Sequence, residues 1–462
     1  MTAARAEATT ARRGAASPLA HPAMTGRVVL WVVVGINVAI VETLYFTSDP
    51  AVKNTLIGIA KFFGINAAML MILQIVLIAR VPWLDRRIGM DRLTAWHRWV
   101  GFTLFWAIIL HPTFILVGYS RFDKLPILRE FTNFAGVFAT LMGMIAAGII
   151  IIAVALSIRF ARRRLGYETW HAIHVLLYGA ITLAIIHQLL EPTSFKTSTA
   201  ATVYWWMVWG FAIGALLVGR IVTPLWTNMR HKLRVVAVVP ESDNVTSIYM
   251  QGRDLERLDA KPGQFFIWRF LSKDLWWQAN PFSLSAAPDG RTLRLTAKAV
   301  GRTSRALRHV PVGTRVYVEG PYGAFTSFHR AKEATLLIAG GVGVTPIRAL
   351  LEELPGPVTV LYRVRDTADA VLLRELQDLA RARGAQLHVL TGRTGAGDPP
   401  NNPFDPRNLV ALVPDIKERD VFVCGPSPMT TAVLRNLKAL GVPRQQVHAE
   451  RFSLAGTSVA KP

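Results

Sequence analysis

Six long apolar stretches dominate the first half of the chain. Each has about 19 to 27 residues, enough for an α-helix to cross a hydrocarbon core of roughly 30 Å. They predict membrane-spanning helices near residues 28–46, 62–80, 97–118, 133–158, 171–190 and 203–222. The first stretch is too long for a signal peptide, and no small-residue cleavage site follows it, so we interpret it as a membrane anchor.

From about residue 230 the pattern changes to short alternating runs, such as 233–239 and 292–297, broken by glycine and proline. This pattern predicts a small antiparallel β-barrel. An apolar strand at 334–339 then enters a glycine-rich turn and a helical pattern, and further apolar strands follow at 358–362 and 421–423. Strands that alternate with helices predict an α/β domain with a parallel sheet.

These patterns predict a multi-domain membrane protein: a six-helix transmembrane bundle, then a β-barrel, then an α/β domain. Residues 1–26 are rich in Ala, Thr and Arg and predict a disordered cytoplasmic tail. The expected boundaries are 27–225 for the bundle, 230–328 for the barrel and 332–462 for the α/β domain. The sequence has no internal repeat and does not indicate an oligomeric state.

Composition narrows the class of partner. The chain has 462 residues, is 52% hydrophobic and carries a net charge of +22, which suits contact with an anionic inner leaflet and with anionic cofactors. No basic stripe with interleaved aromatic residues is present, which argues against nucleic acid as a partner. The single cysteine, Cys424, excludes an intramolecular disulfide and a thiolate cluster for zinc or iron–sulfur.

Arginines predict the orientation of the bundle. They gather before the third and fifth spans, whereas the loops on the opposite side hold fewer. By the positive-inside rule, both termini are expected in the cytoplasm and the chain is expected to be a multi-pass protein of the inner (plasma) membrane. The arginines in question are Arg80, Arg86, Arg87, Arg92 and Arg98, and then Arg159, Arg162, Arg163 and Arg164.

Two predicted spans carry two histidines each: His97 and His111 in the third, His174 and His187 in the fifth. Fourteen residues make almost four helical turns, so His97 and His111 point to one face about 21 Å apart. The expected pairs, His97 with His174 and His111 with His187, fit two stacked haems, each with two axial imidazoles. The alternative is that these histidines only pack within the bundle, but four ionisable groups inside a membrane are costly without a function.

The fifth span is less regular. Thirteen residues from His174 to His187 leave the two imidazoles well over 90° apart on an ideal helix, so we expect a bend or an irregular turn there. His171 competes with His174, but it would lie about 24 Å from His187, a worse match in level to the third span. We prefer His174.

Three segments of the predicted barrel, 280–285, 298–304 and 320–323, carry groups suited to a flat ring and a diphosphate. A ring needs an aromatic platform and a hydroxyl. A diphosphate needs cations, backbone N–H groups and glycines that allow close approach. Each segment alone is more typical of a strand end or a loop, so the interpretation depends on all three occurring in order.

The predicted α/β domain carries a phosphate-binding loop. Its residues are Gly340, Gly341, Gly343, Thr345 and Pro346, at the start of a predicted helix whose free N–H groups suit an anion. The spacing differs from Gly-x-Gly-x-x-Gly, so the motif alone gives moderate support. The strand at 358–362 leads to Arg363 and Arg365, which suit a ribose 2′-phosphate or are solvated surface arginines. Cys424, Gly425 and Pro426 end the last strand at the sheet edge where ligands bind, and a small buried residue is the default role of Cys424.

Together these motifs resemble the ferric reductase and NADPH oxidase superfamily, whose soluble half is similar to ferredoxin-NADP reductases. The resemblance implies that Pro281, Phe282 and Ser283 bind the flavin ring, with Phe282 stacked on it and Ser283 near its N5. It also implies catalytic roles for Ser283, Cys424 and Phe452, with Phe452 near the flavin face. Lys298, Gly301 and Thr303 would hold the diphosphate, and Thr345 and Cys424 would line the nicotinamide site.

Two details refine the resemblance. The family commonly has a basic residue where this chain has Asn280, which removes a cation from the diphosphate site and leaves FAD preferred over FMN. The fifth span matches the family's Tyr-Glu-x-Trp-x-x-x-His pattern, which supports His174 over His171. The matching residues are Tyr167, Glu168, Trp170 and His174.

The resemblance implies a transmembrane oxidoreductase that uses NADPH, or NADH, FAD and two b-type haems. NADPH yields two electrons at once and a haem iron accepts one, so a flavin is needed between them. The acceptor outside the cytoplasm is oxygen, giving superoxide, or ferric iron, and the short outer loops do not decide between these. The alternatives are a membrane-anchored flavin reductase without haem, or a haem sensor or assembly subunit with a vestigial nucleotide site.

Overall fold

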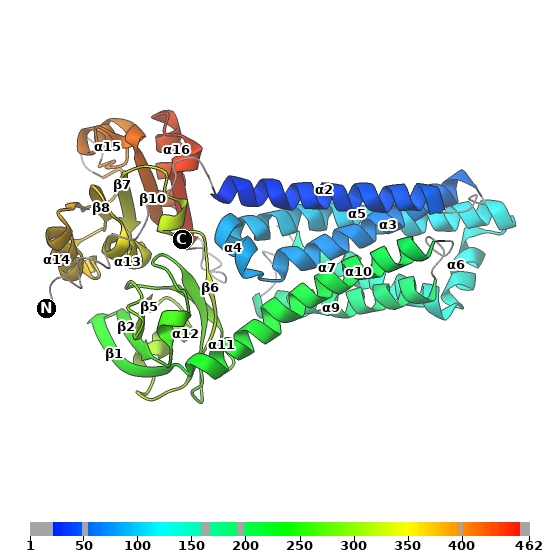
Figure 1. Cartoon of the computed structure of the whole chain (residues 1–462), viewed down its shortest axis with the longest axis horizontal. Coiled ribbons are helices and arrows are strands. Elements are labelled where there is room, and N and C mark those ends of the chain that lie inside the picture. The colour runs from blue at the N-terminus through cyan, green and yellow to red at the C-terminus, as the bar shows by residue number, and fades with distance from the viewer. Residues whose placement is uncertain (1–21, 49–53, 159–166, 192–197, 397–400, 453–462) are drawn as a thin grey trace, which may run out of the picture.

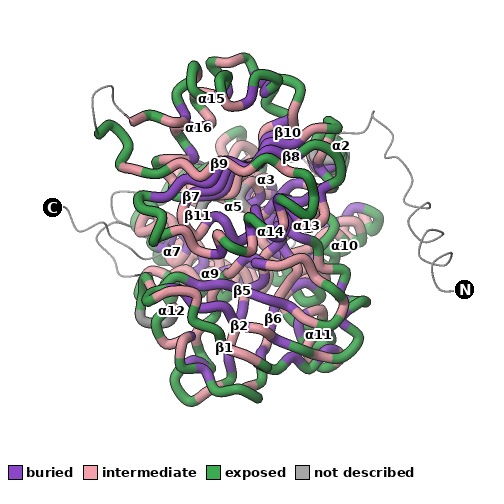
Figure 2. Tube along the Cα trace, turned by 90° about the vertical axis from the view of Figure 1, so that its left-hand side faces the viewer, coloured by how far each residue is buried: buried purple, intermediate pink, exposed green. Residues whose placement is uncertain are grey.

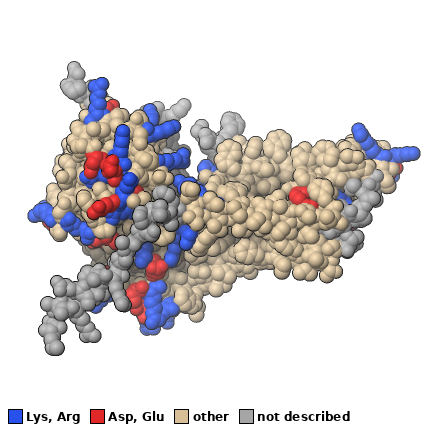
Figure 3. All heavy atoms as spheres, turned by 45° about the horizontal axis from the view of Figure 1, so that its top comes forward, with Lys and Arg blue, Asp and Glu red and all other residues tan. Residues whose placement is uncertain are grey.

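The computed structural model of the chain describes residues 22–48, 54–158, 167–191, 198–396 and 401–452. It is elongated, with a helical bundle at one end and two soluble domains side by side at the other (Figure 1). Six helices of the described residues are long and apolar enough to cross a membrane, which confirms the predicted bundle. Figure 3 shows charged side chains on the soluble domains and at the far tip, and few along the bundle between them.

In the described residues, the bundle consists of six long helices and three shorter ones. The long helices α3 and α5 pack closely, as do α7 and α9. A short π-helical turn, η1, joins α10 to α11. The helices are α2 (Pro22–Ser48), α3 (Thr55–Ile78), α4 (Pro82–Ile88), α5 (Met90–Asp123), α6 (Ile127–Ala135), α7 (Phe138–Ser157), α9 (Tyr167–Leu190), α10 (Thr199–Leu217), η1 (Val218–Val222) and α11 (Thr223–His231).

Several helix boundaries differ from the predictions. The first helix begins at Pro22, inside the segment expected to be a tail, and residues 1–21 lie outside the described residues. The second begins at Thr55, because the Asn54 side chain caps it by accepting a hydrogen bond from the Ile57 backbone at 2.9 Å. The fourth begins at Phe138, because residues 127–135 form the separate helix α6. Apolar patterns locate a span well, whereas local capping sets its ends.

The prediction of a bend or an irregular turn in the fifth span is wrong. Helix α9 is a continuous α-helix from Tyr167 to Leu190. His174 lies beside His97 of α5, and His187 interacts with His111 of α5 while its Nδ1 donates to the Ala139 carbonyl of α7. Both histidines therefore reach their partners on α5 without a break in α9.

The barrel domain is antiparallel, as predicted, and is built from two three-stranded sheets. One sheet has the order β1-β2-β5 and the other β4-β3-β6. Apolar side chains from both sheets, including Ile248, Phe266 and Trp268, form its buried core. The elements are β1 (Arg234–Ser242), β2 (Val245–Gln251), β3 (Phe265–Phe270), β4 (Asn280–Ser283), β5 (Thr292–Lys298), α12 (Arg302–Ala306) and β6 (Val316–Tyr322).

The second soluble domain is α/β, with five parallel strands in the order β11-β10-β7-β8-β9, which confirms the prediction. Figure 2 shows these strands as a mostly buried layer above the barrel. Their apolar runs fit a sheet covered on both faces. The elements are β7 (Ala334–Gly340), α13 (Val344–Glu353), β8 (Val358–Arg363), α14 (Leu373–Arg383), β9 (Gln386–Leu390), α15 (Pro406–Leu412), β10 (Arg419–Pro426), α16 (Ser427–Ala439) and β11 (Val447–Phe452).

Strand β6 of the barrel is fixed against the end of the bundle that meets the soluble domains. The Asn228 amide of α11 pairs with the Val318 backbone, donating at 2.7 Å and accepting at 2.8 Å. The buried Asp85 carboxylate of α4 accepts from the Gly323 amide at 2.7 Å. Charged groups bound to backbone amides make strong contacts. The segment 320–323, which the sequence assigned to the ring site, therefore lies directly against the membrane domain.

Candidate functional site

The structure brings His97 of α5 and His174 of α9 together. Their ring centres are 6.2 Å apart, and the ring planes are inclined by 72°. An imidazole nitrogen binds a metal at about 2 Å. Adding roughly 1 Å from each nitrogen to its ring centre gives about 6 Å between two rings on opposite sides of one metal ion. The separation fits the axial pair that a six-coordinate haem iron requires.

The second pair has a matching arrangement on both of its helices. His111 donates from Nδ1 to the Ala60 carbonyl of α3 at 2.8 Å, and His187 donates from Nδ1 to the Ala139 carbonyl of α7 at 2.9 Å. A carbonyl that holds Nδ1–H fixes the tautomer in which Nε2 has its lone pair free for a metal. The two rings are close enough to interact electrostatically.

Two glycines make room for the outer imidazoles. A Cβ at Gly64 of α3 would lie 2.8 Å from the His111 ring, and one at Gly143 of α7 would lie 2.9 Å from the His187 ring. Real Cβ atoms do not approach that closely, so any larger residue would displace the ring. Sequence reasoning missed these glycines, because nothing in the pattern relates a glycine to a histidine on another helix.

The surroundings of His174 are better suited to a metal-binding histidine than those of His171. The Trp170 ring stacks on it at 5.0 Å and 22°, and the Trp170 indole donates to Ser157 at 3.1 Å. His171 is exposed on the surface of α9. The Nδ1 atoms of His97 and His174 are buried without a hydrogen-bond partner among the described residues. The rings thus retain unused nitrogens at a site suited to a metal-bearing group.

On the barrel, the predicted ring site lies along β4. The Ser283 hydroxyl is buried and has no hydrogen-bond partner among the described residues, whereas Phe282 is half-buried and Pro281 is exposed. The Trp268 indole donates to the Phe282 carbonyl at 2.9 Å and fixes the strand. An orphaned buried hydroxyl beside an accessible aromatic ring fits the flavin contact that the resemblance implies.

The predicted diphosphate segment lies beyond β5. Lys298 and Gly301 are exposed, and the Ser304 hydroxyl accepts from the Val300 and Gly301 amides at 3.0 and 2.9 Å. This turn keeps the cation and the glycine at the surface, where a diphosphate can approach them. Asn280 is half-buried at the start of β4, and the Thr303 side chain lies outside the described residues.

The glycine loop after β7 is too tightly packed to hold side chains. A Cβ at Gly343 would overlap the Cys424 carbonyl oxygen, and one at Gly340 would overlap the Met429 sulfur. Gly341 adopts a φ of +52°, which favours glycine. The loop runs into α13, where Thr345 and Pro346 are buried. Because Gly425 lies against Gly340, the carboxyl ends of β7 and β10 meet where parallel sheets bind ligands.

Cys424 is fully buried, and burial together with the nearby Glu450 carboxylate raises the pKa of its thiol well above the usual value. The thiol therefore stays protonated at neutral pH, and a thiolate nucleophile is excluded. Glu450 pairs with Cys424 across the β10–β11 register. Nothing in the sequence pattern indicates that Glu450 lies beside Cys424. The Phe452 side chain lies outside the described residues.

A cluster of ions that sequence reasoning missed joins the two soluble domains. Arg294 of β5 and Arg348 of α13 both pair with Glu375 of α14, at 3.0 and 2.7 Å. Both arginines also donate to the Ser285 carbonyl, at 2.6 and 3.2 Å. Shared pairing in a buried place fixes geometry. The cluster thus holds the strand of Ser283 next to the helix that follows the glycine loop.

One arginine connects the histidine pair with the barrel. Arg220, in the π-helical turn η1, interacts electrostatically with His97 and also with Tyr322 and Glu319 of β6. It donates to the Ile78 carbonyl at 3.1 Å. Single π-helical turns are often found at functional sites. The inner histidine site and the ring site on the barrel therefore share a common neighbour.

Three family models match the chain in order. They are "Ferric reductase like transmembrane component" at residues 63–185, "FAD-binding domain" at 228–326 and "Oxidoreductase NAD-binding domain" at 337–435. The chain has the architecture of the ferric reductase and NADPH oxidase superfamily. It is an integral membrane protein and an NAD(P)H-dependent oxidoreductase with an FAD site and a nicotinamide nucleotide site.

Several proteins that the soluble half of the chain is similar to are reductases. One is a glycine betaine monooxygenase reductase subunit from Chromohalobacter salexigens, 28% identical, covering 52% of this chain and 68% of the relative. A 3-ketosteroid-9-alpha-monooxygenase ferredoxin reductase component from Mycobacterium tuberculosis is 33% identical, and the match covers 48% of this chain and 65% of the relative. The solved structure of a ferredoxin reductase in carbazole 1,9a-dioxygenase is 26% identical, with a TM-score of 0.40. The match covers 48% of this chain and 69% of that structure's chain.

The two arginines after β8 of this ferric reductase-like chain lie in different surroundings. The Arg363 guanidinium is buried and donates to the Leu390 and Thr391 carbonyls and the Thr394 hydroxyl. Arg365 is exposed. We expect Arg365→Ala to raise the KM for NADPH about tenfold, the effect of losing roughly 1.4 kcal/mol of phosphate binding, and to leave the KM for NADH unchanged. Steady-state kinetics with both nucleotides tests this, with Arg381→Ala on α14 as control; parallel changes for both nucleotides would contradict it.

His329 makes the junction between the soluble domains and α4 sensitive to pH. Its Nε2 donates to the Arg86 carbonyl at 3.0 Å, and burial lowers the pKa of His329 to about 4. Because the folded pKa lies below the unfolded one, this contribution is present above pH 6.5 and is lost as the pH falls toward 4. We expect about 2 kcal/mol less stability at pH 5 than at pH 7 from this group, measured by thermal unfolding. His329→Gln should flatten the profile, and an unchanged slope would contradict the assignment.

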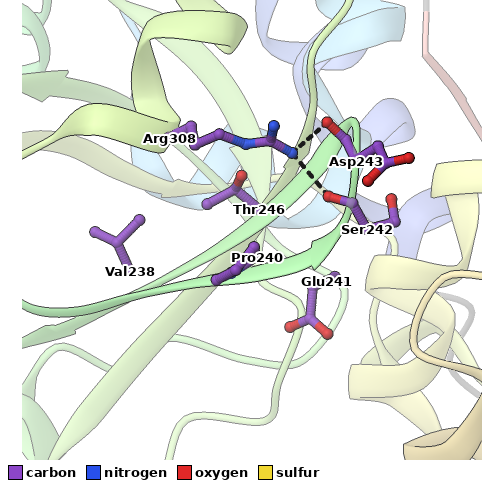
Figure 4. A pocket seen from close by; sticks show the side chains of 7 residues that line it. All are labelled: Val238, Pro240, Glu241, Ser242, Asp243, Thr246 and Arg308. Carbon is purple, nitrogen blue, oxygen red and sulfur yellow. Dashed lines mark hydrogen bonds between the residues drawn. The ribbon is translucent and has the colours of Figure 1, made fainter.

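A hollow on the outer surface of the barrel lies away from these sites. It has a volume of about 460 Å³ and lies at the β1–β2 turn (Figure 4). Arg308 points across it and donates to the Ser242 and Asp243 carbonyls. Because that guanidinium is already bound to backbone and the hollow is open, it belongs to the structure of the turn, and we assign the redox site to β4, β7 and the bundle.

Proposed function

We propose that the protein is a transmembrane oxidoreductase that passes electrons from cytoplasmic NADPH through FAD and two b-type haems to an acceptor on the outer side. The observation that carries the proposal is the 6.2 Å separation of the His97 and His174 rings inside the bundle. Bound flavin would accept a hydride and release electrons singly, and bound haems would carry them across the membrane. The remaining steps depend on residues of the chain.

The soluble domains orient the reactants. Gly340, Gly343 and Gly425 pack closely and have no side chains. The phosphates of a nucleotide could therefore approach the backbone N–H groups of this loop. The Ser283 hydroxyl offers a hydrogen bond at the ring site, and the paired Arg294, Arg348 and Glu375 keep that strand beside α13. Holding two reacting groups in a fixed geometry lowers the entropy cost of transfer.

The junction with the bundle sets the next step. Tyr322 is buried at the end of β6, with the Arg80 guanidinium 5.4 Å from its ring centre, and Arg220 interacts electrostatically with both Tyr322 and His97. The Asp85 contact to the Gly323 amide holds this loop in place. A buried aromatic ring and a fixed cation between two electron carriers give a short, rigid route.

A variant of Arg220 tests this route. We expect Arg220→Gln to slow reduction of haem by NADPH roughly tenfold, equal to about 1.4 kcal/mol in barrier, and to leave flavin reduction unchanged. Arg220→Lys, which keeps the charge, should restore part of the rate. Stopped-flow absorbance separates the flavin and haem phases. Equal slowing of both phases would contradict a role between the two carriers.

The outer acceptor is oxygen or ferric iron in this proposal. Both suit an iron with two axial imidazoles, because electron transfer to either needs no coordination to that iron. No cluster of three metal-binding side chains occurs among the described residues, so a built ferric-chelate site is not part of the described outer face. Superoxide production with oxygen as acceptor, compared with reduction of ferric citrate under argon, assigns the acceptor. Reduction of neither would contradict the outer half of the proposal.

A further inference from the structure

A cavity lies between the membrane domain and the α/β domain. It has a volume of about 360 Å³ and is bounded by the first turns of α2, the junction of α4 with α5, and the edge strand β11. Figure 1 shows this end of α2 beside the α/β domain. Its lining includes Gly323 and Glu450 as well as Met24 and Arg444.

Arginines from separate parts of the fold line this cavity. Arg27 comes from α2, Arg87 from α4 and Arg444 from the turn before β11, and Arg92 of α5 lines the same cavity. Among the described residues that line it, the acid is Glu450, and no described acidic side chain forms an ion pair with these four arginines. Four arginines and one acidic residue among the described residues therefore line the cavity, and positive charge exceeds negative charge there.

Two of these guanidinium groups also have one buried nitrogen each without a hydrogen-bond acceptor. Arg27 Nε and Arg92 Nη1 are buried and have no partner among the described residues. Arg27 and Arg444 repel each other electrostatically. Buried donors without acceptors are costly, and like charges at close range add to that cost. An anion with several acceptor oxygens would remove both costs at once.

We infer that this cavity binds a phosphate group through Arg27, Arg87 and Arg444. Guanidinium groups pair with phosphate oxygens through two parallel hydrogen bonds, which makes arginine the residue best suited to this anion. The location favours a phospholipid headgroup as the source. The exposed side chains of Trp31 and Trp83 lie on α2 and α4, and tryptophan at such positions is typical of the membrane–water interface.

Binding there would connect three parts of the chain. A phosphate held by Arg27 and Arg87 would also attract Arg444 and so hold the α/β domain against the bundle. The turn of Arg444 leads directly into β11, whose far end carries Glu450 beside Cys424. The anion would thus stabilise the docked arrangement of the nucleotide site. This consequence does not depend on haem or on the outer acceptor.

The test is lipid retention by the full-length protein in detergent. Native mass spectrometry would count phosphatidylglycerol and phosphatidylcholine adducts on the wild type, on Arg27→Gln, on Arg444→Gln and on the control Arg435→Gln, an exposed arginine of α16 outside the cavity. We expect phosphatidylglycerol to be preferred, and its retention to fall about fivefold with each cavity variant, the effect of one basic residue at an anionic surface. The control should match the wild type.

A second arm separates lipid from free phosphate. If inorganic phosphate raises the melting temperature of the wild type but not of Arg444→Gln, while phosphatidylglycerol shows no preference, the site binds phosphate from solution and the lipid source is wrong. If neither probe distinguishes the cavity variants from Arg435→Gln, the inference is overturned. Flavin content and elution volume show that each variant is folded, so that loss of binding is not loss of structure.

Discussion

We expect His97→Ala to abolish the reduction of haem by NADPH and to leave the reduction of flavin by NADPH intact. The reason is that the His97 ring lies 6.2 Å from His174 and, in the proposed function, would supply one of the two nitrogens that hold the inner haem. A haem with a single protein ligand is held weakly, so haem content should fall by about half, with the outer haem retained. Pyridine haemochrome analysis measures the content, and stopped-flow absorbance measures the two reductions.

His171→Ala is the matched control. It removes an imidazole one helical turn away in α9 whose side chain is exposed, so both haem content and the rate of haem reduction should match the wild type. If His171→Ala loses the haem and His97→Ala does not, the assignment of the inner pair is wrong. If both keep full haem content and full reduction, the four histidines have structural roles.

We expect Gly343→Ala to impair the reduction of flavin by NADPH and to leave the haem sites intact. The added Cβ would overlap the Cys424 carbonyl oxygen and lie 2.9 Å from the Gly425 Cα, so the carboxyl ends of β7 and β10 must separate. Overpacking of this kind costs about 1 to 3 kcal/mol and removes the surface that the nucleotide needs. We expect NADPH-dependent reduction of flavin to fall at least about a hundredfold, or roughly 2.7 kcal/mol. Haem reduction by dithionite should be unchanged.

Gly210→Ala controls for the substitution itself, since a Cβ at that helical position meets no atom within 4 Å. It should keep NADPH activity at the wild-type level. A Gly343→Ala protein that still reduces its flavin with NADPH at the normal rate would show that the loop does not bind the nucleotide. Dithionite separates this outcome from loss of the bundle.

The features that follow from local pattern were predictable from the sequence. Six spans follow from apolar length, the parallel sheet from strands that alternate with helices, and the loop Gly340–Gly343 from glycines before a helix. The pairing of His97 with His174 followed from matched depth in two spans of the same direction. In each case the information lies within one segment, or in a simple rule that relates two segments.

The features that depend on contacts between distant segments were not predictable. Nothing local indicates that Arg363 binds the carbonyls that follow β9 or that Arg220 lies beside both His97 and Tyr322. The prediction of a bend in α9 was wrong, because His174 and His187 both lie near histidines of α5 although α9 is a continuous helix. Tertiary packing decides such points, and it is not encoded in periodicity.

The most direct test of the central claim is an anaerobic visible spectrum of the purified full-length protein, reconstituted with haem and FAD, before and after NADPH. The account predicts bleaching of the flavin, followed by sharp reduced-haem bands that reach the extent given by dithionite. Bleached flavin with haem that stays oxidised, or a protein that binds no haem, would contradict it. The chain would then be a membrane-anchored flavin reductase.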